Sequence, residues 1–176
     1  PPPPPPPYTY PMWLADRHIS QTELQAQRER AREFAFQPTF TLITPVFNPP
    51  ADVLQAAIDS VVAQSYPRWT LILVNAAPEN AAIRALLARV AKACPAVTVL
   101  TLAQNQGISA NANAGLAAAS GNYLLFLDHD DLLAPDALFA ITAAIQHVPE
   151  TDLIYFDEDK VTADGAERHS PWFKPD

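Results

Sequence analysis

From residue 40 onward, the hydrophobic and polar positions follow two alternating patterns. Short runs rich in Val, Ile, Leu, Thr and aromatic side chains predict five β-strands, at about residues 40–46, 69–74, 97–102, 123–127 and 152–156. Apolar residues at helical spacing predict four helices between these strands, at about residues 50–65, 80–93, 108–119 and 135–147. Such an alternation is typical of an α/β fold, a doubly wound and mainly parallel sheet flanked by helices.

The residues before this pattern form two further segments. Residues 1–7 are all proline, which lacks backbone N–H donors, and they contain no apolar pattern to bury, so an extended tail is predicted. Ser20 and Glu23 have the spacing of a capping box, which predicts that a surface helix begins at Ser20. We therefore divide the chain into a proline-rich tail or linker at 1–17, a surface helix with its connection at 18–38, and a main domain at 39–176.

Charge is distributed unevenly along the chain. The sequence carries 11 basic and 19 acidic side chains, which gives a formal net charge of −8. Residues 101–176 hold only three of the basic side chains but twelve of the acidic ones. A nucleic acid is therefore excluded as the expected partner, because a phosphate backbone needs a basic face. A divalent cation, or an anionic ligand bridged by one, fits the acidic half better.

Two further observations concern the cellular compartment. No apolar run reaches the roughly 18 residues of a membrane-spanning helix, and no signal peptide is visible. The single cysteine, Cys94, has no internal partner for a disulfide, which favours a reducing compartment. We expect a cytoplasmic protein without a transmembrane segment, and peripheral association with the inner face of the cytoplasmic membrane stays open.

Three carboxylates follow the strand predicted at 123–127, namely Asp128, Asp130 and Asp131. Ligands of doubly wound sheets bind at the carboxyl ends of the strands, so these acids should lie at the functional edge. If the chain stays extended beyond Leu127, Asp128 and Asp130 point to the same side and can bind Mn²⁺ or Mg²⁺. The alternative is that solvated acids end the strand and that Asp131 or Asp136 caps the next helix.

Several motifs together resemble one family. The stretch "LDHDDLLAPDAL" at 127–138 resembles the D-x-D region of family 2 glycosyltransferases, which have the GT-A fold. The segments at 41–75, 105–131 and 152–165 and the final "PWFKPD" are similar to that family in the same order, especially to its O-antigen and rhamnan-synthesis branch. The resemblance covers residues 39–176 and implies a GT-A, Rossmann-like domain.

The resemblance also implies a function and a site. It implies a metal-dependent, inverting transfer of a sugar from a nucleotide-diphosphate donor to a saccharide or lipid-linked saccharide acceptor in cell-surface polysaccharide biosynthesis, with Mn²⁺ or Mg²⁺ as cofactor. Asp130, with Asp128, would hold the cation, and Phe47 would pack against the nucleotide base. The implied donor-binding residues are Thr44, Pro45, Val46, Phe47, Asn48, Asn75, Asn105, Gly107, Asn113, Asp128 and Asp130.

The sequence departs from the family pattern at three places. Asn75 and Ala76 stand where the family usually has two aspartates that recognise the base, and Ala112 stands where an arginine is frequent. The family's catalytic base belongs to a segment beyond Asp176, so the catalytic residue is unknown and the domain is expected to be truncated at its C-terminus. The main alternative is therefore a catalytically silent domain that binds nucleotide-sugars or serves as a scaffold.

Two other classes of protein fit the sequence motifs less well. A haloacid-dehalogenase-like phosphohydrolase needs D-x-D-x-T or D-x-D-x-V on its first strand, whereas here the motif is D-H-D-D-L after the fourth predicted strand. A dinucleotide-binding Rossmann domain needs G-x-G-x-x-G after its first strand, whereas this strand leads into "PVFNPP".

Overall fold

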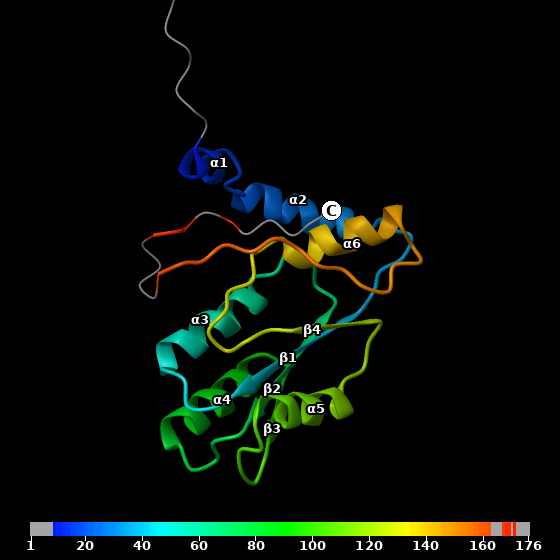
Figure 1. The fold of residues 1–176 in the computed structure, drawn as a ribbon. Coiled ribbons are helices and arrows are strands. Elements are labelled where there is room, and N and C mark those ends of the chain that lie inside the picture. The colour runs from blue at the N-terminus through cyan, green and yellow to red at the C-terminus, as the bar shows by residue number, and fades with distance from the viewer. Residues whose placement is uncertain (1–8, 163–166, 170, 172–176) are drawn as a thin grey trace, which may run out of the picture.

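The computed structural model describes residues 9–162, 167–169 and 171. Its helices are α1 Tyr10–Asp16, α2 Gln21–Ala31, α3 Ala51–Val62, α4 Ala81–Ala93, α5 Ile108–Ala118 and α6 Ala137–His147. Its strands are β1 Phe40–Val46, β2 Trp69–Asn75, β3 Val97–Thr101 and β4 Tyr123–Phe126 (Figure 1). The four predicted helices and the first four predicted strands are therefore confirmed, with small shifts at their ends.

The strands form one parallel sheet in the order β3-β2-β1-β4. Phe40 of β1 pairs with Trp69 on one side and with Tyr123 on the other, so β1 lies in the interior of the sheet. The chain first winds outward from β1 to β3, and α5 then returns it to the opposite side of β1. The strand order thus reverses between β1 and β4, and ligands of open α/β sheets bind at such a switch point. The predicted doubly wound α/β architecture is confirmed.

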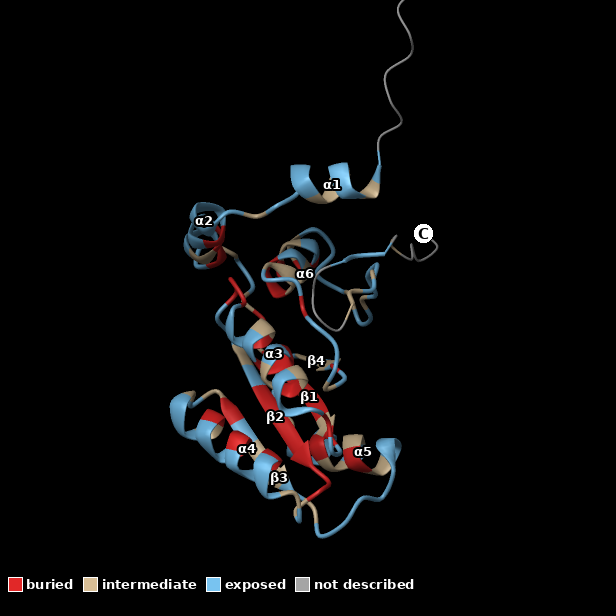
Figure 2. Ribbon diagram, turned by 90° about the vertical axis from the view of Figure 1, so that its left-hand side faces the viewer, coloured by how far each residue is buried: buried red, intermediate tan, exposed pale blue. Residues whose placement is uncertain are grey.

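Helices cover both faces of this sheet (Figure 2). On one face, Leu54 and Ile58 of α3 and Leu87 of α4 belong to the same buried cluster as Leu42 of β1. On the other face, α5 covers a smaller cluster of Ile43, Ile72 and Val74.

The approach of α5 to the sheet depends on Gly115. A Cβ atom at this position would lie 2.5 Å from Ile43 Cγ2 and 2.9 Å from Val74 Cγ2. These separations are far below a normal carbon contact, so only glycine lets the helix backbone come this close.

The N-terminal part contains one predicted helix and one unexpected helix. The capping box of α2 is present: Glu23 N donates to Ser20 Oγ at 3.2 Å, and Ser20 N donates to Glu23 Oε2 at 2.8 Å. This confirms the predicted start at Ser20, although Leu24 and Gln27 of α2 are buried against the domain. Helix α1 lies inside the segment predicted as a tail or linker. The polyproline run at 1–7 lies outside the described residues.

The fifth predicted strand, at 152–156, is wrong. This described segment forms no strand, and β4 is paired with β1 alone. Residues of β4 and of the segment line a pocket of about 830 Å³, and no backbone ladder joins the two. The hydroxyl of Tyr123 donates to Thr151 O at 2.8 Å and so joins β4 to the chain just before this segment. Leu153, Tyr155 and Phe156 of the segment are exposed, Leu153 to 82%, whereas Ile154 is half-buried against the core.

Candidate functional site

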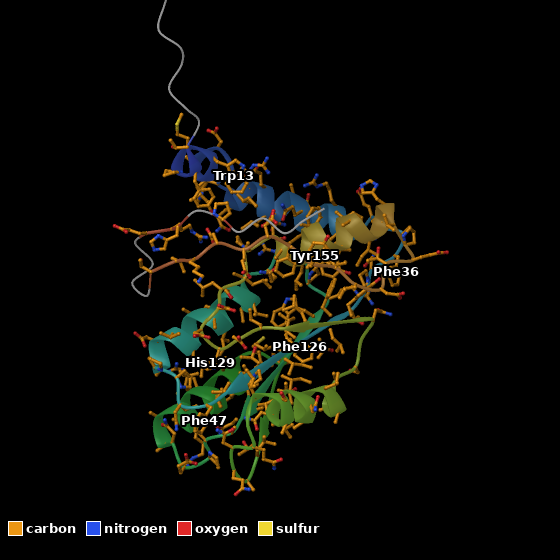
Figure 3. The ribbon with its side chains drawn as sticks, viewed as in Figure 1. Trp13, Phe36, Phe47, Phe126, His129 and Tyr155 are labelled. Atoms are coloured by element: carbon orange, nitrogen blue, oxygen red, sulfur yellow. The ribbon has the colours of Figure 1, made fainter. Side chains whose placement is uncertain are left out.

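The segments that follow the four strands meet at the carboxyl edge of the sheet. Every predicted donor-binding residue lies at the end of a strand or in the turn or helix that follows it. Figure 3 shows Phe47, which follows β1, and His129, which follows β4, at the same end of the molecule. The imidazole Nδ1 of His129 lies 3.2 Å from Pro45 O, so the ends of β1 and β4 are in direct contact. The edge is therefore one continuous surface at the switch point.

The end of β1 presents one aromatic side chain to this surface. Thr44 and Val46 are buried, whereas Phe47 is 47% exposed and can offer a ring face to a planar ligand. Asn48 has a φ of 50°, a left-handed conformation that asparagine tolerates better than most residues. Asn80 Nδ2 donates to Asn48 Oδ1 at 2.9 Å and so ties this turn to the start of α4.

The end of β2 is more enclosed than the end of β1. Asn75 is 1% exposed, and its Oδ1 accepts a hydrogen bond from Ala77 N at 3.1 Å. Among the described residues, no group bonds to Asn75 Nδ2 or to the buried Thr44 Oγ1. Both side chains point to the face of the sheet that α3 and α4 cover. Each lies two residues from core residues of that face, and residues two apart in a strand share a face. Two buried polar atoms thus remain available for hydrogen bonds at this edge.

The loop from β3 to α5 is organised around Asn105. Its Oδ1 accepts hydrogen bonds from Gly107 N at 2.9 Å and from Asn111 Nδ2 at 2.8 Å. Gly107 has a φ of 87°, which explains the glycine directly before α5. Asn113, predicted for the same region, is exposed on α5. Asn111 is a residue that the sequence reading missed. It is buried and fixes the loop, and its N-x-N spacing with Asn113 was the available signal.

The acidic stretch after β4 is a turn, so the assumption that the chain stays extended past Leu127 is wrong. The strand ends at Phe126, and Asp131 N donates to Asp128 O at 3.2 Å. We call residues 128–131 the acidic turn. Its three carboxylates are exposed, whereas the His129 ring points away toward β1.

Negative charge is concentrated at the acidic turn. Although Asp131 is exposed overall, nearby protein atoms remove part of the water around its carboxyl, and this desolvation, together with the charges of Asp128, Asp130 and Glu158, raises its pKa. Glu158 comes from the segment after α6, so acids from two parts of the chain repel one another here. A cation bound at this place would relieve that repulsion.

The capping alternative is not supported for Asp136. Asp136 stands at the N-cap position of α6 but makes no side-chain capping hydrogen bond. Leu138 N, in the first turn of α6, instead donates to Gln64 Oε1 at 3.0 Å.

The acidic turn fits a divalent cation that shares its coordination with a ligand. Asp128 and Asp130 are exposed and supply hard oxygen atoms of the kind that Mn²⁺ and Mg²⁺ prefer. Within the described part of the chain, no three His, Cys, Asp or Glu side chains are grouped closely enough to hold a metal alone. Such ions are commonly bound through one or two carboxylates, with phosphate oxygens and water completing the shell.

The doubly wound sheet with helices on both faces is the architecture of the GT-A class of folds. Residues 41–172 match the family described as Glycosyl transferase family 2, and the chain belongs to that family.

The chain is similar to several bacterial proteins. It is 35% identical to the O-antigen biosynthesis protein RfbC of Myxococcus xanthus over 177 residues, which cover 100% of this chain and 14% of that relative. It is 36% identical to protein y4gI of Sinorhizobium fredii, and the alignment covers 84% of this chain and 16% of that relative. The putative teichuronic acid biosynthesis glycosyltransferase TuaG of Bacillus subtilis is 32% identical over 58% of this chain and 40% of its own length. The chain thus spans about one seventh of the first two relatives.

Solved structures share the fold. The mannosyltransferase PcManGT of Pyrobaculum calidifontis, in complex with GDP-Man and Mn²⁺, has a TM-score of 0.55 and 22% identity, over 68% of this chain and 39% of that one. Staphylococcus aureus TarS 1–349 in complex with UDP-GlcNAc has a TM-score of 0.56 and 21% identity, over 62% of this chain and 31% of that one. No helix among the described residues of this chain is long and apolar enough to cross a bilayer.

Proposed function

We propose that this chain is the donor-binding domain of a glycosyltransferase that builds a cell-surface polysaccharide. It binds a nucleotide-diphosphate sugar together with Mn²⁺ or Mg²⁺, and the sugar passes to a saccharide or lipid-linked saccharide acceptor. The observation that carries the proposal is the acidic turn at the switch point, held against the end of β1 by the contact between His129 and Pro45. The relatives named for O-antigen and teichuronic acid biosynthesis support the pathway class.

Residues from each strand end have a role in this proposal. Phe47 packs against the nucleotide base, and Thr44 Oγ1 and Asn75 Nδ2 supply polar atoms beneath it. The turn formed by Asn105 and Gly107 lies beside the ribose and diphosphate.

Asp130, assisted by Asp128, would hold the cation on the diphosphate. A divalent cation in this place supplies Lewis-acid stabilisation of the departing diphosphate. The two carboxylates would fix the position of the cation, and their negative charge would balance its positive charge when no nucleotide is bound.

The reaction proposed is direct attack of an acceptor hydroxyl on the anomeric carbon, with inversion. No residue of this chain is assigned as the base that takes the hydroxyl proton. Asp159 is a poor candidate because it accepts a hydrogen bond from Tyr10 Oη at 2.6 Å and pairs with Arg168 at 2.9 Å. The second candidate function, a catalytically silent nucleotide-sugar-binding or scaffold domain, is favoured by Ala76 and Ala112, which replace family side chains.

Titration calorimetry with UDP and GDP, each with and without Mn²⁺, tests the donor-binding site. We expect Mn²⁺ to tighten binding of one nucleotide in the wild-type chain and Asp130→Ala to abolish that enhancement, because the variant removes a cation ligand. Asp152→Ala is the matched control, since it removes an exposed carboxylate outside the acidic turn and should leave the enhancement unchanged. Equal nucleotide affinity with and without Mn²⁺ in the wild-type chain would refute metal-dependent donor binding.

A further inference from the structure

The acidic turn belongs to a loop that is fastened at both ends. At its start, Leu127 N donates to Ile43 O at 3.1 Å, and His129 contacts Pro45 O at 3.2 Å. These contacts fix the loop to β1. At its other end, the loop from Leu133 to the first turn of α6 is held by Ser60 in the last turn of α3 and by Gln64 and Ser65 just after that helix. The carboxylates lie between the two anchored ends, so both ends determine where they point.

Gln64 makes the central contacts of the second anchor. Its side chain is 4% exposed and lies just after α3. Its Nε2 donates to Ala134 O at 2.6 Å and to Ser60 O at 3.1 Å, and its Oε1 accepts from Leu138 N at 3.0 Å. One amide group therefore joins three elements: the last turn of α3, the loop, and the N-terminus of α6. It also supplies the helix cap that Asp136 does not provide.

Two serines on either side of Gln64 strengthen this anchor. Ser60 Oγ accepts a hydrogen bond from Leu133 N at 3.1 Å, two residues beyond the acidic turn. Ser65 N donates to Pro135 O at 2.8 Å. The hydroxyl of Ser65 in turn donates to the buried Gln27 Oε1 of α2 at 2.6 Å. Helix α2 thus supports the anchor from behind.

The chemistry of the anchor suggests a purpose beyond filling space. An apolar side chain of similar size could fill the same space between α3 and α6, but it would leave Ala134 O and Leu138 N without this partner. Gln64, by contrast, uses both its donor and its acceptor on backbone atoms of the loop and of α6. Hydrogen bonds of this kind specify a position because they depend on distance and angle.

We propose that Gln64 is a positioning residue, which sets the orientation of the acidic turn for cation and diphosphate binding. It contacts neither ligand and acts only through the backbone of residues 133–138. The proposal rests on the proposed function, because the turn is taken to be the cation site.

Gln64→Met and Gln146→Met form a matched pair of test variants. Methionine keeps the length of the side chain and removes its hydrogen bonds. Gln146 likewise bridges two backbone groups, since its Oε1 accepts from Phe36 N at 3.2 Å and its Nε2 donates to Phe36 O at 2.8 Å. It belongs to α6, and its side-chain hydrogen bonds within the described part of the chain go to Phe36 and to Thr142 O rather than to the loop, so it controls for the loss of a bridging amide.

The first measurement is amide hydrogen exchange without metal or nucleotide. We expect Gln64→Met to increase deuterium uptake in peptides covering 127–138, whereas Gln146→Met increases it only around Phe36. Unchanged uptake over 127–138 in Gln64→Met overturns the proposal. Ser60→Ala, which removes the contact to Leu133 N and a hydrogen bond to Ala57 O within α3, is the milder second variant if Gln64→Met does not fold, and the same two outcomes apply to it.

The second measurement is the ratio of nucleotide affinity with Mn²⁺ to that without it. We expect this ratio to fall about 10-fold in Gln64→Met, at the low end of the range for residues that orient metal ligands, and to stay at the wild-type value in Gln146→Met. A wild-type ratio of one overturns the proposed function and with it the role of the turn. A wild-type enhancement that Gln64→Met retains overturns the role of Gln64 alone.

Discussion

Two regions of the molecule, one around β1 and β2 and the other around β4, differ in how completely their apolar side chains are covered. Strands β1 and β2, with α3, α4 and α5, form a closed region in which Ile43 is fully buried. Strand β4 and the segment after α6 form an open region, and Figure 2 shows β4 in the colours of partial and full exposure beside the buried β1. Phe126 is the register partner of Ile43 and lies on the same face, yet it is 59% exposed.

The cause of this difference is the position of α5. The helix packs mainly over β1 and β2, where Gly115 allows close contact, rather than over β4. Residues with the same apolar character therefore have different energetic roles on neighbouring strands. Apolar residues in the closed region exclude water, whereas Leu124 and Phe126 line the pocket that separates β4 from residues 149–156. An apolar strand pattern thus indicates a tendency to be buried rather than burial itself.

The largest effect is expected from the register pair that spans the two regions. Ile43→Ala should lower the free energy of unfolding by about 2–5 kcal/mol, because it leaves a cavity in a closed cluster. Phe126→Ala should change it by less than about 1 kcal/mol, because most of the ring already contacts solvent. Urea-induced unfolding followed by circular dichroism measures both values. Similar losses in the two variants would contradict the division into closed and open regions.

A smaller effect is expected at Gly115. Gly115→Ala should destabilise the protein by about 1–3 kcal/mol, because the added methyl group collides with Ile43 and Val74. Helix propensity alone predicts the opposite sign, a gain of about 1 kcal/mol. Ala117→Gly, at an exposed position of α5, makes the reverse change and should cost about 1 kcal/mol. Stabilisation by Gly115→Ala in the same unfolding assay would show that α5 does not need this close approach.

The same division explains which sequence predictions succeeded. In the closed region, side-chain period and burial agree, so the strands around Ile43 and Ile72 and the helices above them followed from the pattern. The capping box at Ser20 succeeded because its hydrogen bonds are local. The segment at 152–156 has the composition of a strand, but pairing depends on the distance to β4, which the pattern does not contain.

The location of the candidate site residues was predictable from the sequence, but their contacts were not. The rule that ligands bind at strand ends placed Asp128, Phe47 and Asn105 at one edge. The turn at 128–131 was missed because a D-x-D motif does not reveal whether the chain bends. The role of Gln64 could not be predicted either, because its partners lie 70 and 74 residues away in sequence.

The smallest effect concerns a polar contact that holds the open region. Tyr10 Oη of α1 donates to Asp159 Oδ2 at 2.6 Å, and Arg168 binds the same carboxylate at 2.9 Å. Partial burial, followed by the hydrogen bond to Asp159 and its charge, raises the pKa of Tyr10 to about 12. Burial also raises the pKa of the Asp159 carboxyl, but the hydrogen bonds from Tyr10 and Arg168 and the charge of Arg168 outweigh it and hold that pKa below its usual value. This region is thus joined to α1 by charge and hydrogen bonding.

Tyr10→Phe should lower the free energy of unfolding by about 0.5–1 kcal/mol near pH 7, a modest amount because water screens the contact. The pKa of Tyr10 is higher in the folded protein than its usual 10.0. The contribution is therefore complete below pH 10 and is lost as the pH rises toward about 12. Asp159 gives the opposite dependence, since its pKa is lowered on folding, so its contribution is lost as the pH falls through the acid range.

Urea unfolding of the wild-type protein and of Tyr10→Phe between pH 7 and 11 measures the difference between their free energies of unfolding. This difference should narrow above pH 10, and a double-mutant cycle with Asp159→Asn isolates the contribution of the pair. A difference that stays constant to pH 11 would mean that the hydroxyl does not stabilise the fold through this carboxylate, and the open region would then need another attachment to α1.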